Sequence, residues 1–234
     1  MKASPALDRA VIAGLPTFAG LASDDLDAVL ADARSVRYPK GSAVFEQGGE
    51  ANSFFLLLHG HLQVVKVTPA GQQVVVRYVV PGDLFGIAVQ MGRSSFPATA
   101  TAVVDSVCLV WPASAWSTLV ARVPTLAGRV LQTMGARLDE AHTRVVEMST
   151  QEVERRVAHA VLRLAAKAGR PEAQGTRIDF PITRQDIAEM TGTTLHTVSR
   201  LLSAWEGLGL VEGGRQKLTI CDAEGLARIA DPEI

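Results

Sequence analysis

A change of hydrophobic periodicity near Pro112 divides the chain into a strand-rich half and a helical half. Between Tyr38 and Trp111, short apolar runs are separated by glycines at intervals typical of β-strands joined by tight turns. The expected strands are SAVFE, SFFLLL, LQVVKV, QVVVRYV, FGIAV, ATATAV and SVCLVW. Strands at such regular spacing predict a sandwich or a roll.

The helical half begins with a long heptad pattern. Apolar residues recur at alternating spacings of 3 and 4 within PTLAGRVLQTMGARLDEAHTRVVEMST, and they are Leu131, Met134, Leu138, Ala141, Val145 and Met148. This spacing is typical of the seam of a two-stranded coiled coil, so we expect a homodimer that forms through this helix. The alternative is a single amphipathic helix packed on its own β-domain, although such a helix usually shows a broader apolar stripe.

Composition sets further bounds. With 47% hydrophobic and 20% charged residues among 234, the chain has the composition of a folded globular protein. No apolar run approaches the roughly 18 residues that span a bilayer, so no membrane partner is expected. Two cysteines, Cys108 and Cys221, are too few for a disulfide framework, and a cytoplasmic location is the natural expectation.

The net charge is −1, so the chain lacks the excess of basic residues that is typical of nucleic-acid-binding proteins. Any binding to DNA must therefore come from a few locally placed cations, backbone amides and helix N-termini.

Two capping patterns divide the C-terminal third into helices. Ser149 and Glu152 match a capping box, which predicts that a new helix begins at this point and ends at Gly169. Thr183 and Asp186 form a second box, with Asp in place of the usual Glu. RPEAQGTRID between the two reads as a polar connector.

Residues 182–212 fit a helix-turn-helix. Gly192 supplies the turn, and the second helix begins at Thr194. His196, Ser199 and Arg200 share one exposed face near its N-terminus, where side chains can reach base edges in the major groove. The stretch GLGLVEGGRQKLTI predicts a β-hairpin wing that places Arg215 and Lys217 near phosphates. Two ordinary packed helices in a core are the alternative.

These motifs resemble the cyclic-AMP receptor protein / fumarate-nitrate reductase regulator (CRP/FNR) family of bacterial transcription regulators over nearly the whole chain. The matching pieces are PKGSAVFEQGGEANSFFLLLHGHLQV, VVPGDLFG, the heptad helix and ITRQDIAEMTGTTLHTVSRLL. The resemblance implies an α+β protein with an N-terminal cyclic-nucleotide-binding-like β-roll (jelly-roll), a long dimerisation helix and a C-terminal winged helix-turn-helix. The corresponding domains are 1–120, 121–149 and 150–234, and RNA polymerase is an expected partner beside double-stranded DNA.

The same resemblance assigns roles on the second helix. The base-reading positions match Leu195, His196, Ser199 and Arg200, and the backbone-contacting positions match Thr194 and Thr197. The Ser-Arg pair resembles the fumarate-nitrate branch, whose half-sites begin TTG. His196 departs from the glutamate of most relatives, and TTLHTVSR looks most like regulators that respond to nitrogen oxides.

The effector is harder to infer. Nucleotide-binding relatives hold the ribose and phosphate with a Glu and an Arg, but Ile87 occupies the Glu position and Phe96 or Pro97 the Arg position. A cyclic phosphate would then lack a partner unless Arg93 supplied one, so cyclic AMP is not the expected effector. No N-terminal cysteine cluster exists for an iron–sulfur cluster. Haem is an alternative cofactor if His142 ligates its iron; otherwise His142 lies on the solvent-exposed flank of the coiled coil. The expected pocket residues are Phe85, Gly86, Ile87, Phe96 and His142.

The competing class is a small-molecule-binding or enzymatic β-roll whose helical tail only oligomerises it. His59-Gly60-His61 could suggest a metal enzyme, but no carboxylate follows in LQVVKV. Gly60 also predicts a hairpin tip with both histidines toward solvent. We therefore expect no catalytic residues and no metal site.

Overall fold

The computed structural model describes residues 9–15 and 17–232, which form two compact units. The N-terminal unit comprises the described residues up to Val67 together with Arg77–Leu138. The C-terminal unit comprises Thr68–Val76 and the described residues from Asp139 onward. A single helix, α4 (Pro124–Thr150), contributes to both units.

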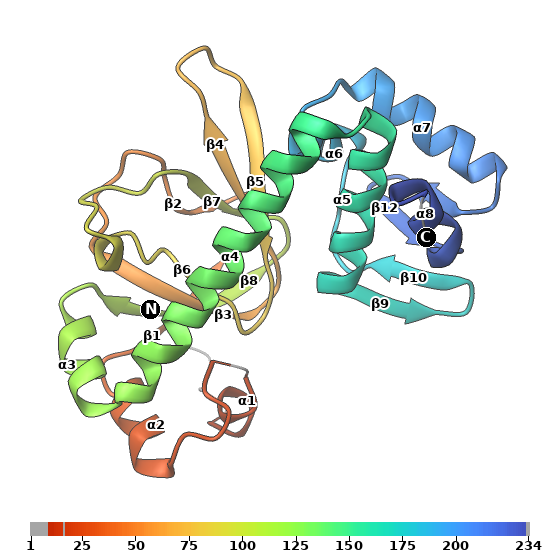
Figure 1. Ribbon diagram of the computed structural model, residues 1–234. Helices are drawn as coiled ribbons and strands as arrows, with labels where there is room; N and C mark the ends of the chain where they lie inside the picture. Colours follow the sequence, from red (N-terminus) through yellow and green to blue (C-terminus); the bar gives the residue numbers. More distant parts are fainter. Residues whose placement is uncertain (1–8, 16, 233–234) are drawn as a thin grey trace. The chain divides into compact units, whose positions relative to one another are not determined.

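Two four-stranded antiparallel sheets make the β-roll, which belongs to the N-terminal unit except for Gln73–Val76 of its strand β5 (Figure 1). The first has the order β1-β8-β3-β6, with bounds Arg34–Tyr38, Ser106–Pro112, Ser53–His59 and Leu84–Phe85. The second has the order β2-β7-β4-β5, with bounds Ala43–Phe45, Thr99–Ala102, Leu62–Val67 and Gln73–Val79.

Strand β3 explains why the sequence contains the uninterrupted apolar run SFFLLL. Successive side chains of a strand point to opposite faces. Phe55 and Leu57 enter the core with residues of the second sheet, whereas Phe54 and Leu56 pack with residues of the helices. A strand buried on both faces needs apolar residues at every position rather than at alternate ones.

Helices cover the outer face of the first sheet. They are α1 (Arg9–Ala13), α2 (Ser23–Leu30), α3 (Ala115–Arg122) and the start of α4. Leu126 and Val130 bury the first two turns of α4 against this sheet, while the indole of Trp111 donates to the carbonyl of Val29 at 2.7 Å.

The C-terminal unit is a winged helix-turn-helix (Figure 1). Its helices are α5 (Val153–Ala168), α6 (Arg184–Thr191), α7 (Leu195–Gly207) and α8 (Ala223–Ala230). Two hairpins form one sheet of order β11-β12-β10-β9, with bounds Val211–Gly214, Lys217–Ile220, Gly175–Ile178 and Gly169–Glu172. The α+β class with a β-roll, a long helix and a winged helix-turn-helix is therefore confirmed. Within the described ranges, no helix is both long and apolar enough to cross a membrane.

Several local predictions are wrong. Strand β1 is not among the expected strands, and of FGIAV only Phe85 lies in a strand, as the second residue of β6, before the chain turns at Gly86. The polar connector RPEAQGTRID contains the hairpin β9–β10. Ser149 does not begin a helix, because its hydroxyl donates to the carbonyl of Val145 at 2.8 Å and α4 continues to Thr150.

Candidate nucleic-acid interface and ligand cavity

Local hydrogen bonds fix the starts of α6 and α7. The hydroxyl of Thr183 accepts from the amide of Asp186 at 3.0 Å, and the carboxylate of Asp186 accepts from the amide of Thr183 at 2.8 Å. This reciprocal pair is the predicted capping box. Gly192 ends α6 at φ +64°, a conformation that costs other residues energy. Thr194 then caps α7 by accepting from the amide of Thr197 at 3.1 Å.

Helix α7 has one buried and one exposed face. Val198, Leu202 and Trp205 are buried, and the Trp205 indole donates to the carboxylate of Glu154 on α5 at 3.1 Å. The other face carries the six predicted DNA-contacting residues, of which Thr194, Leu195, His196 and Arg200 are exposed and Thr197 and Ser199 half-buried. The helix therefore presents its N-terminal polar face to solvent while three large side chains anchor it.

The cations of this unit fall into two groups. Most arginines are committed to acids, as in the pairs Arg177–Glu172 at 2.7 Å and Arg184–Glu206 at 3.5 Å. Arg200, Arg215 and Lys217 are exposed and form no ion pair with any described residue. Arg215 lies at the turn of the β11–β12 wing, where Gln216 adopts φ +59°. These three cations, which the sequence placed near DNA, thus have no acid partner among the described residues, as is also true of the exposed Arg170.

The heptad side chains of α4 are largely uncovered in the single chain. The exposed fractions are 70% for Leu131, 55% for Leu138, 62% for Val145 and 55% for Met148. Ala141 is exposed too, whereas Met134 is half-buried and packs on the core of the N-terminal unit. Val146, outside the heptad set, is exposed as well.

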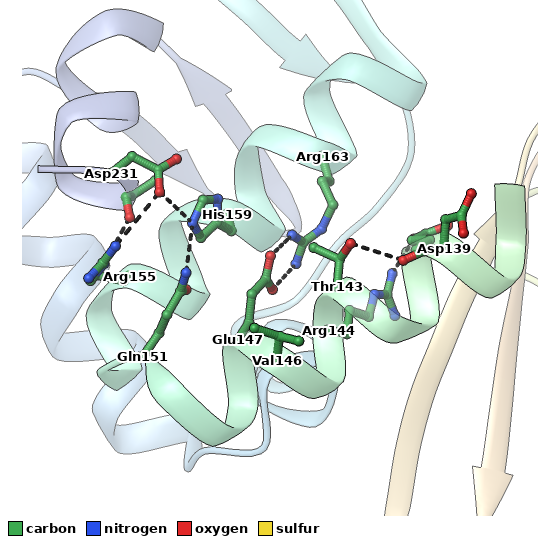
Figure 2. A network of polar contacts seen from close by, with 12 residues as sticks. Asp139, Thr143, Arg144, Val146, Glu147, Gln151, Arg155, His159, Arg163 and Asp231 are labelled. Carbon is green, nitrogen blue, oxygen red and sulfur yellow. Dashed lines mark hydrogen bonds and ion pairs between the residues drawn. The ribbon is translucent and has the colours of Figure 1, made fainter. Parts of the chain in front are cut away.

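Polar contacts join the end of α4 to α5 within the C-terminal unit. Figure 2 shows Glu147 facing Arg163, whose Nη2 donates to Glu147 Oε2 at 2.9 Å. Glu147 is buried despite its charge, and the bidentate geometry satisfies both carboxylate oxygens. Nearer the start of α5, Arg155 and His159 both face Asp231, which follows α8 (Figure 2).

A cavity of about 260 Å³ opens in the β-roll, within the N-terminal unit. Four of the five predicted pocket residues line it, namely Phe85, Gly86, Ile87 and Phe96. Gly86 has φ +69°, and a Cβ there would lie 2.6 Å from the ring of Phe55. The cavity thus depends on a glycine at the turn after β6.

Four cationic side chains also line this cavity, and the sequence pointed only to Arg93 among them. They are Lys66, Arg77, Arg93 and Arg137. Arg137 of α4 donates to the backbone carbonyl of Leu84, and Arg77 of β5 lies 3.6 Å from the carboxylate of Asp83. Lys66 and Arg93 are exposed and form no ion pair within the described ranges. The expectation that an anion would find no partner here is therefore wrong. The missed residues come from strands and a helix far apart in the sequence, so no local motif marks them.

The histidines behave differently from one another. His142 is exposed and belongs to the C-terminal unit, so its contact with an effector stays a prediction. His59 is exposed as expected, but His61 is buried, because Val103 N–H and the Ser106 hydroxyl donate to its carbonyl and hold it against the sheet. The described part of the chain contains no group of three or more His, Cys, Asp or Glu side chains suited to a metal ion.

The β-roll and the helix-turn-helix of this chain both match models of known domain families. Residues 35–123 match the model of the cyclic nucleotide-binding domain, and residues 155–229 match the Crp-like helix-turn-helix domain. The chain is 30% identical to the cyclic AMP receptor protein of Thermus thermophilus over 217 residues, 93% of this chain and 97% of the relative.

Two further comparisons extend the likeness. Identity to the transcriptional activator protein FnrA of Stutzerimonas stutzeri is 26%, covering 88% of this chain and 84% of FnrA. The structure of FixK2 from Bradyrhizobium japonicum superposes with a TM-score of 0.74 at 21% identity, covering 84% of this chain and 96% of FixK2, a likeness of fold alone.

Proposed function

Because the chain belongs to the CRP/FNR family of transcription regulators, we propose that it is an effector-responsive regulator that binds DNA as a homodimer. The observation that carries this proposal is the exposed face of α7, where Arg200 lies near the helix N-terminus and Arg215 and Lys217 lie on the adjoining wing, all three without an ion pair to any described residue. Those three cations supply local positive charge, although the net charge of the chain as a whole is −1.

Each part of this face has a role in the proposal. Helix α7 enters the major groove, and Arg200 donates two hydrogen bonds to the O6 and N7 atoms of guanine. His196 contributes a weaker preference, since an imidazole can donate from one nitrogen and accept at the other. Thr194 and Thr197 contact phosphates, which position the protein without reading sequence. Such contacts fit a TTG-type half-site.

The exposed heptad side chains of α4 provide the dimer interface. Two such helices packed in parallel would cover Leu131, Leu138, Val145 and Met148, which a monomer leaves in water. A two-fold axis along the coiled coil places the two recognition helices about one DNA turn, or roughly 34 Å, apart. The operator should therefore be a palindrome.

The cavity of the β-roll is the proposed effector site. Cyclic AMP is disfavoured because the buried Ile87 replaces a carboxylate, and none of the described lining residues carries an acid that could accept from the ribose hydroxyl. Haem binding would need a histidine ligand from His142, because the described lining contains no histidine. Met91 is the only described lining residue of a type that ligates haem iron. We assign no catalytic residue and regard RNA polymerase as the partner through which transcription responds.

Selection of operators from a random duplex library tests this proposal. Full-length protein should enrich palindromes with TTG half-sites whose centres lie about 10 base pairs apart. A variant that carries Arg200→Ala should enrich palindromes less strongly and without preference at the guanine, and Arg122→Gln, on the exposed end of α3, should select the same palindrome as the parent. Enrichment of unpaired half-sites, or of no motif by the parent protein, would refute a dimeric sequence-specific regulator.

A further inference from the structure

The lining of the β-roll cavity is strongly unbalanced in charge. Lys66, Arg77, Arg93 and Arg137 contribute four positive charges, and the described lining residues contribute no negative one. Asp83 lies outside the lining and offsets only Arg77, at 3.6 Å. A group of like charges around a cavity is unfavourable without an anion, so this arrangement selects a negatively charged occupant.

The remaining wall of the cavity is apolar and includes the rings of Phe45, Phe85 and Phe96. The rings of Phe45 and Phe96 stack with centroids 4.0 Å apart, and Phe85 lies 6.1 Å from Phe45. Ile87 is buried in the position next to Gly86. A wall of this kind favours a planar or compact apolar body and offers no side-chain carboxylate to a sugar hydroxyl.

We propose that the effector is an organic oxyanion, a phosphate ester or carboxylate on a compact apolar body that lacks sugar hydroxyls. The inference rests on the proposed function only in treating this cavity as the effector site. Arg77 and Arg137 hold the anion at the half-buried end, and Lys66 and Arg93 complete its neutralisation at the exposed end. The volume of about 260 Å³ suits one fused ring system with its acid group.

The position of Arg137 gives such a ligand a route to the DNA-binding form. Arg137 precedes the exposed Leu138 on α4, so an anion bound to its guanidinium acts on the helix that carries the proposed dimer interface. The guanidinium already donates to the Leu84 carbonyl beside the cavity, which orients it there before a ligand arrives. An anion would then stabilise one position of α4 relative to the β-roll over others.

Calorimetry with four probes tests the ligand class on the full-length protein. Naphthyl phosphate and naphthoate carry the acid, naphthol is the neutral control, and cyclic AMP carries a phosphate with a sugar. We expect at least one naphthyl anion to bind saturably below 1 mM and naphthol and cyclic AMP to bind at least about tenfold more weakly, the effect of one lost charge-assisted hydrogen bond. The stronger of the two anions identifies phosphate or carboxylate as the preferred acid.

Variants locate the binding. Arg137→Gln and Arg93→Gln should each weaken the naphthyl anion about tenfold or more, and Arg122→Gln, outside the cavity, should not. Arg93 is exposed and makes no ion pair with described residues, so its variant keeps the test valid if loss of the Arg137–Leu84 contact disturbs folding. Absence of binding by both anions, equal binding of naphthol or cyclic AMP, or insensitivity to both cavity variants would overturn the proposal.

Duplex binding in the same samples separates this proposal from the proposed function. A protein that binds a palindromic duplex but neither naphthyl anion remains a regulator and refutes the oxyanion effector. A protein that binds a naphthyl anion through Arg93 and Arg137 but binds no duplex, with or without ligand, keeps the ligand assignment and refutes the regulator.

Discussion

Replacement of Leu138 by arginine should separate the dimer. Leu138 is 55% exposed in the single chain, and complete burial of a leucine contributes about 1.5–3 kcal/mol. Burial of the remaining 55% therefore contributes about 0.8–1.7 kcal/mol per protomer, or about 1.7–3.3 kcal/mol for the two copies in a symmetric dimer. Loss of this amount raises the dissociation constant of the dimer by about 20- to 200-fold, before the repulsion of two facing guanidinium groups is added.

Sedimentation velocity at micromolar concentration measures this change. The parent should sediment as a dimer and Leu138→Arg as a monomer with little affinity for a palindromic operator. Ala136→Arg is the matched control, because Ala136 is exposed on the same helix and lies outside the heptad seam. The reasoning fails if Leu138→Arg remains dimeric, if the control dissociates equally, or if a monomer still binds the palindrome tightly.

Three further predictions concern local structure. Thr183→Ala should lower the free energy of unfolding by about 1–2 kcal/mol in urea titrations, and Thr183→Ser by much less, because the serine hydroxyl can rebuild the capping box. At pH 8 a thiol reagent should modify only Cys221 in the folded protein and both cysteines in denaturant, since burial raises the pKa of Cys108 to about 12; modification of both thiols before unfolding would contradict this. Gly86→Ala should destabilise the protein by about 1–3 kcal/mol more than Gly92→Ala in thermal unfolding. Both glycines have positive φ, but only at Gly86 would a Cβ lie within 3 Å of a ring, that of Phe55. Equal losses of stability would show that the Phe55 ring moves to accommodate the methyl group.

Local patterns in the sequence predicted the helix boundaries of the DNA-binding region well. Thr183 with Asp186, Gly192 and Thr194 each carry a short-range signal, because a cap or a positive-φ turn needs particular residues within one helical turn. The same reasoning failed at Ser149. A serine near a helix end can cap the next helix or bond back to its own, and the sequence does not distinguish the two.

Features that depend on distant residues could not be predicted. Strand β1 alternates polar and apolar residues only over SVRY, and its pairing with β8, as at Val36 and Cys108, identifies it. Hairpin β9–β10 is polar and owes its place to β12, the neighbouring strand. The cavity cations Lys66, Arg77 and Arg137 meet because three separated elements converge, and no spacing between them records that contact.

The roles of Arg200 and His196 decide the central claim that α7 reads DNA. Anisotropy of a labelled palindrome and its single-base variants, at one fixed salt concentration, should show that Arg200→Ala costs about 1–3 kcal/mol and flattens the preference at the guanine. His196→Ala should cost less, and His196→Glu should sharpen selectivity at its base pair, because a carboxylate can only accept. Greater loss of discrimination in His196→Ala than in Arg200→Ala would contradict the assignment of roles. Undiminished operator binding by Arg200→Ala would contradict the claim that α7 reads the operator through Arg200.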